Sequence, residues 1–88
     1  MLLNLEQLTK ASTDVERILF TEGEPNLKIE IEKLAENIVD IRTKKEFYQH
    51  VNTLFLNVLL NRLDSVGKLG EQRTIESRKI LVKLIQSI

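Results

Sequence analysis

The stretch from Thr43 to Val66 constrains the fold more than any other part of the chain. Wound as a helix at about 100° per residue, it is apolar on three sides. The apolar side chains are Phe47, Val51, Leu54, Phe55, Leu56, Val58, Leu59, Leu60, Leu63 and Val66. The polar side chains His50, Thr53, Asn57, Asn61 and Asp64 fall on one narrow stripe. Such a helix needs neighbours on several sides, so we predict that it is the central helix of a small bundle.

A first flanking helix is expected over residues 5–19. Asn4 and Gln7 have the spacing of a capping box, in which each side chain bonds the backbone N–H of the other residue. The apolar stripe of this helix consists of Leu5, Leu8, Ala11, Val15, Ile18 and Leu19. Phe20 follows directly, and we expect it to join the core at the helix end.

A turn and a second helix are expected next. Within residues 21–26, Gly23 permits a left-handed turn and Pro25 disfavours helix in the residue before it. The helix is expected over residues 26–42, because apolar residues recur there at helical spacing. They are Leu27, Ile31, Leu34, Ile38 and Ile41.

Capping residues predict the two remaining boundaries. Thr43 and Glu46 have capping-box spacing, which starts the central helix with hardly any loop before it. Gly67 is expected to end that helix, and residues 67–70 to form a short loop before a final helix over residues 71–88. The inward residues of the final helix are expected to be Ile75, Leu81, Val82, Leu84, Ile85 and Ile88. The outward residues are expected to be Gln72, Glu76, Lys79, Lys83 and Gln86.

The predicted helices make residues 1–88 a single domain, an all-α antiparallel four-helix bundle, in which no active site is visible. The chain has one histidine, His50, and no cysteine, whereas zinc sites need three or four ligands at recognisable spacing. No glycine-rich phosphate loop is present, since GKLG lacks the lysine–hydroxyl ending of such a loop. We therefore expect a protein that is not an enzyme and that binds neither a cofactor nor a metal.

The N-terminal residues and the apolar windows indicate a soluble protein without a secretory signal. The first residues, MLLNLEQLTK, lack the basic and apolar regions of a secretory signal. The most apolar window, residues 54–60, is far shorter than the ~20 residues that a membrane span requires. We expect no membrane insertion.

The charge distribution is uneven although the chain is neutral, with thirteen acids and thirteen bases. Residues 1–42 hold nine acids and five bases, which gives −4, and residues 43–88 hold four acids and eight bases, which gives +4. The two halves could attract one another, or the basic half could carry a binding surface. Overall neutrality argues against a nucleic-acid binder, because such domains are usually basic.

Two arginines break the helical pattern. Arg62 and Arg78 both fall on apolar stripes, where a guanidinium must pair or extend along its stem to water. Each is explained either by an ion pair with the acidic half or by a role in anchoring a partner's carboxylate. With Arg73, Lys79 and Lys83 nearby, the final helix is the candidate interaction face, and the candidate partner-binding residues are Arg73, Arg78, Lys79 and Lys83.

The order of helices, with its proline-containing break, resembles the immunity proteins of pediocin-like bacteriocins, particularly the enterocin A immunity type. The stretches that carry the resemblance are Glu24 to Ile38, Leu59 to Leu63 and Glu71 to Leu84. The resemblance implies a cytoplasmic four-helix bundle that protects the producing cell from its own bacteriocin. It also implies, as the partner, the bacteriocin-bound mannose phosphotransferase permease, with specificity in the C-terminal half. The alternative is another small helical interaction module, such as an adaptor, a phage regulator or an antitoxin.

Overall fold

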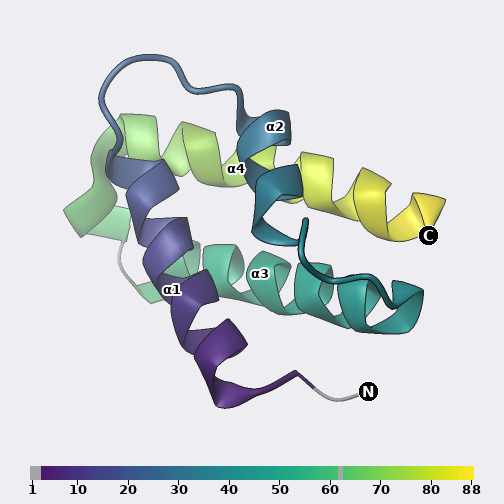
Figure 1. Ribbon diagram of the computed structural model, residues 1–88. Helices are drawn as coiled ribbons and strands as arrows, with labels where there is room; N and C mark the ends of the chain where they lie inside the picture. The colour runs from purple at the N-terminus through teal and green to yellow at the C-terminus, as the bar shows by residue number, and fades with distance from the viewer. Residues whose placement is uncertain (1–2, 62) are drawn as a thin grey trace.

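The computed structural model describes residues 3–61 and 63–88, and this part of the chain contains four α-helices and no strand. The helices are α1 (Leu5–Phe20), α2 (Leu27–Leu34), α3 (Ile41–Asn61) and α4 (Leu63–Ser87). Helices α3 and α4 run in opposite directions, as do α1 and α2 (Figure 1). The all-α four-helix prediction is therefore confirmed.

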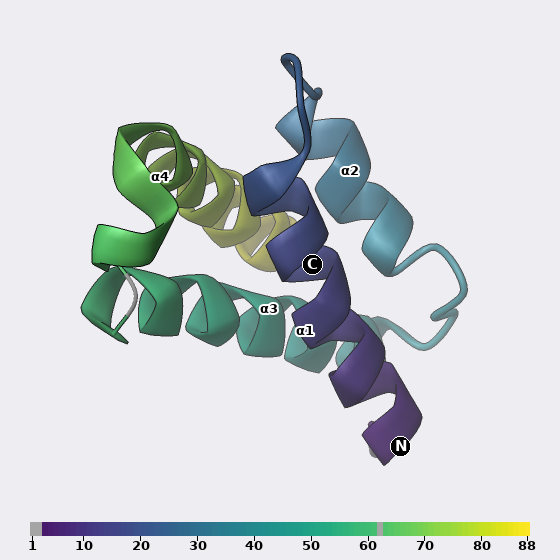
Figure 2. The same ribbon diagram turned by 90° about the vertical axis from the view of Figure 1, so that its left-hand side faces the viewer.

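Helix α4 is the central element of the fold: it packs more extensively than any other helix, chiefly against α3, and it also contacts α1 and α2. Helix α3 packs on α4 and α1. Helices α1 and α2 lie on the same side of α4 (Figures 1 and 2). The prediction that α3 is central is wrong, since part of its apolar surface has no helix against it. Leu56 and Leu59 are half-buried, and Leu60 is 70% exposed.

Helix α1 begins as its sequence predicts. Asn4 Oδ1 accepts from the backbone N–H of Gln7 at 2.8 Å, and the backbone N–H of Asn4 donates to Gln7 Oε1 at 3.0 Å. Its buried stripe is Ala11, Val15, Ile18 and Leu19. Leu5 and Phe20, which were predicted to be apolar contacts, are exposed instead. For Leu5 the reason is visible in Figure 1, where the first turn of α1 projects beyond α3.

Helix α2 is half as long as its apolar spacing predicts, and α3 begins earlier than expected. Asp40, rather than Thr43, caps α3: its Oδ1 accepts the backbone N–H of Thr43 at 2.9 Å and the Thr43 hydroxyl at 3.2 Å. The backbone hydrogen bond from Thr43 is the main reason why the pKa of Asp40 lies below its usual value. Because α3 starts at Ile41, that side chain leaves the predicted apolar stripe and is 66% exposed.

Gly67 breaks the helical path, as predicted, but the break falls inside α4. Its φ of 69° and ψ of −171° bend the helix, a conformation that favours glycine. Residues 68–70, predicted to be loop, are already helical, and the Thr74 hydroxyl donates to the Gly70 carbonyl at 2.7 Å. Helix α3 ends at Asn61 rather than before Gly67.

The core lies where α1, α2 and α3 meet the inner face of α4. Its largest fully buried side chains are Ile18, Ile31, Val51, Phe55, Thr74, Ser77 and Leu81. Tyr48 of α3 is also buried, and burial, followed by the nearby charge of Glu32, raises the pKa of its phenol. Two small polar residues thus occupy inward positions of α4, which leaves larger apolar residues of the same helix outside.

Candidate protein-binding surface on α4

The inner face of α4 carries Arg73, which holds the end of α1. Its Nη1 donates to the carbonyls of Ile18, Leu19 and Thr21 at 2.9, 3.2 and 2.7 Å, and its Nη2 donates to the Gly23 carbonyl at 2.7 Å. The last carbonyls of a helix lack intrahelical partners, and a guanidinium offers five donors in a planar fork. Arg73 therefore satisfies the C-terminal carbonyls of α1 and fixes the turn that follows.

Burial removes Arg73 from the predicted partner-binding set. The residue is only 6% exposed, and none of the ion pairs among the described residues includes it. The negative end of the α1 dipole takes the place of a counter-ion. A partner has no access to a side chain whose terminal nitrogens are occupied in this way, so we assign Arg73 a structural role.

Arg78 lies on the flank of α4 that faces α3. Its Nε donates to Asn52 Oδ1 at 3.2 Å, and the side chain is half-buried. The predicted ion pair between Arg78 and the acidic half is wrong, because within the described residues its polar contact is this neutral amide of the basic half. The other arginine of this prediction, Arg62, lies outside the described residues.

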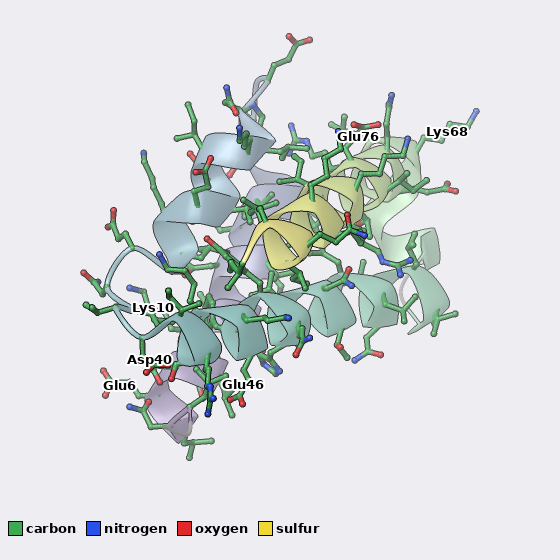
Figure 3. The ribbon with its side chains drawn as sticks, turned by 90° about the vertical axis from the view of Figure 1, so that its right-hand side faces the viewer. Glu6, Lys10, Asp40, Glu46, Lys68 and Glu76 are labelled. Atoms are coloured by element: carbon green, nitrogen blue, oxygen red, sulfur yellow. The ribbon has the colours of Figure 1, made fainter. Side chains whose placement is uncertain are left out.

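The two lysines of the predicted set lie on the outer surface of α4, as expected. Lys79 and Lys83 are exposed, and Lys79 Nζ lies 3.8 Å from Glu76 Oε1. Both side chains of this ion pair are more than half exposed, so it contributes only ~0–1 kcal/mol. Glu76 and Lys68 point outward from α4 in Figure 3.

A groove of about 640 Å³ runs along this outer surface. Its lining residues are Ile75, Glu76, Arg78, Lys79, Ile80, Val82, Lys83 and Gln86. Ile75 and Val82 are 42% and 43% exposed, so their predicted inward orientation is wrong. The inward face is formed instead by small residues with Leu81, and ranking residues by hydrophobicity places Ile75 and Val82 on the wrong side.

The sequence did contain a signal for this groove. Ile75 and Val82 are seven residues apart, two helical turns, and therefore share one face of α4 with Lys79. Thr74, Ser77 and Leu81 have their own helical spacing on another face, and that stripe is the buried one. The groove combines an apolar surface with three bases and one acid, a composition suited to binding a partner's side chains.

The remaining candidate metal-ligating groups of the described residues are one histidine and the acidic side chains. His50 is half-buried, and its Nε2 has no hydrogen-bond partner in the described part of the chain. No group of three His, Asp or Glu side chains in residues 3–61 and 63–88 is placed to hold a metal ion. Within the same ranges, no helix has the length and apolar character needed to cross a membrane.

Comparisons with known proteins give no match among family models, curated proteins or solved structures.

Proposed function

We propose that this protein is a non-catalytic binding protein that uses the α4 groove to contact another protein. The observation that carries the proposal is the exposure of Ile75 and Val82 on one face of α4, beside Arg78 and two exposed lysines. Protein interfaces combine an apolar centre with a polar rim, and arginine is enriched among the residues that dominate their energy. The inner face of α4 already supports the fold, so its outer face is free to bind.

Among binding functions, we propose bacteriocin immunity, exerted in the cytoplasm on the bacteriocin-bound mannose phosphotransferase permease. Three features support this proposal: the all-α four-helix arrangement, the resemblance of the three sequence stretches to pediocin-like immunity proteins, and the position of the groove in the C-terminal half. In the family that the chain resembles, specificity is associated with that half.

Expression in bacteriocin-sensitive bacteria tests this function. Cells that make the protein should survive a pediocin-like bacteriocin that kills cells carrying an empty vector. The variant Lys79→Glu/Lys83→Glu should lose protection while melting at nearly the parent temperature, because exposed lysines contribute little to stability. The control Lys10→Glu/Lys45→Glu changes the net charge equally at exposed positions outside α4 and should still protect.

Two results would contradict these proposals. Unchanged killing by every pediocin-like bacteriocin tried would reject immunity. Capture of a soluble partner that depends on Lys79 and Lys83 would then identify a different interaction module. Full protection by the double lysine variant would move the binding surface away from α4.

A further inference from the structure

The α4 groove has the length and composition of a binding site for one helix. Its lining residues extend from Ile75 to Gln86, a span of ~16 Å at ~1.5 Å per residue, or about three turns. Ile75 and Val82 lie two turns apart on the same side, which matches apolar residues at i and i+7 of a partner helix. A short amphipathic helix therefore fits the pattern of exposed apolar residues.

The charges that line the groove determine the sign of the charge that a partner must carry. The lining contains three bases, Arg78, Lys79 and Lys83, and one acid, Glu76, so it is net basic. The pair between Lys79 and Glu76, at 3.8 Å and well exposed, is weak enough to exchange for a better one. A second copy of this chain would bring an equally basic groove, and like charges would oppose self-pairing through α4.

Arg78 is positioned to receive a carboxylate. Its Nε is bound to Asn52, which orients the plane of the guanidinium. Its two terminal nitrogens have no acceptor within the described part of the chain, and the side chain lines the groove. A planar fork that is already oriented binds a carboxylate through two parallel hydrogen bonds and loses little rotamer entropy when it does so.

We propose that the α4 groove binds an acidic amphipathic helix of the partner, with Arg78 as the anchor for one of its carboxylates. This inference rests on the proposed role of α4 as the binding surface and adds the chemistry of what binds there. The apolar face of the partner helix covers Ile75 and Val82, and its acidic flanks meet Lys79 and Lys83. Asn52 acts as a positioning residue that keeps the Arg78 guanidinium oriented for carboxylate binding.

Fluorescence anisotropy with synthetic peptides tests the proposal directly. The probe is a labelled helical peptide of about 15 residues with leucines at i, i+3/i+4 and i+7 spacing and glutamates on both flanks. Matched peptides carry lysine in place of glutamate, or serine in place of leucine. The full protein should bind the acidic amphipathic peptide at least about tenfold more tightly than either, and added salt should weaken binding.

Variants of the protein separate the contributions of the lysines, Arg78 and Asn52 to peptide affinity. Lys79→Glu/Lys83→Glu should weaken binding by about tenfold or more, whereas the control Lys10→Glu/Lys45→Glu should leave it within about twofold. Asn52→Ala keeps every charge but frees Arg78, so affinity should fall by roughly two- to fivefold. That loss should disappear in an Arg78→Ala background, which a merely structural role of Asn52 would not produce.

The outcomes distinguish this inference from the proposed function. If all three peptides bind equally, or the lysine peptide binds best, the acidic-helix inference is wrong even where the survival assay shows protection through α4. If the protein ignores all peptides but binds vesicles of anionic lipid through Lys79 and Lys83, the groove is a membrane-contact surface and the inference again fails. Selective binding of the acidic peptide without protection would support the inference and reject immunity.

Discussion

Replacing Arg73 by alanine should destabilise the protein more than any other substitution of a charged residue in the described chain. The change removes the donors of four hydrogen bonds to the end of α1 and to the turn that follows it. Two of these bonds are fully buried, and each carbonyl left without a donor there costs ~1–3 kcal/mol. The other two bonds are partly buried, so water can hydrogen-bond to the Thr21 and Gly23 carbonyls in place of Arg73. Removal of the buried charge also removes its desolvation penalty, which offsets part of this cost. We expect the free energy of unfolding to fall by ~3–5 kcal/mol in total.

Urea unfolding followed by circular dichroism at 222 nm measures this loss, and a thermal scan gives a second reading. A loss of that size should lower the melting temperature by at least roughly 12 °C in a domain of this length. Arg73→Lys keeps the charge, but an ammonium has three donors for four carbonyls, so its stability should be intermediate. The matched control is Arg17→Ala, because Arg17 is exposed and its contacts with Asp14 and Glu30 are surface ion pairs. The control should change stability by no more than ~1 kcal/mol. Equal losses in Arg73→Ala and Arg17→Ala would refute the assignment of Arg73 as the residue that holds α1.

Three further predictions concern the core, the bend and the cap. Phe55→Ala, at a fully buried site, should cost ~3–5 kcal/mol in urea unfolding, whereas Leu60→Ala, at a largely exposed one, should cost less than ~0.5 kcal/mol. Gly67→Ala should cost ~1–3 kcal/mol through backbone strain alone, because nothing lies within 4 Å of the added Cβ; a variant as stable as the parent would contradict the bend. The pKa of Asp40 is lower in the folded than in the unfolded state, so its stabilising effect is complete above about pH 4 and is lost as the pH falls through the folded pKa. Asp40→Asn does not titrate, so its unfolding midpoint should fall less steeply than the parent's in acid, and parallel pH profiles would refute the cap.

Local sequence rules predicted those parts of the fold that local interactions decide. The capping box at Asn4, the break at Gly23 and the outward orientation of Lys79 and Lys83 are confirmed, because each depends on residues within a turn or two along the chain. The start of α3 was displaced because Asp40 and Thr43 are both competent caps. The choice between them follows from burial of Ile38 and exposure of the residues after it, which only the packed structure determines.

The candidate site was predicted in part, and its errors have a common origin. Arg73 was assigned to the surface because its acceptors are backbone carbonyls 50 to 55 residues away, and a carbonyl leaves no trace in the sequence. Ile75 and Val82 were placed inside because branched apolar residues are usually buried. In α4 buried positions are taken by Thr74 and Ser77, and the larger Ile75 and Val82 remain outside and line the groove.

The division of α4 into two faces has a consequence for how such a protein evolves. Substitutions at exposed positions such as 75, 79, 82 and 83 should change stability little and combine additively with changes elsewhere. Positions 73, 74, 77 and 81 on the opposite face are buried in the core and tolerate little change. With the proposed binding role of the groove, a lineage can exchange one partner for another through a few surface mutations while the scaffold stays constant. Descendants of this chain that differ in specificity should diverge along the groove before they diverge at Arg73.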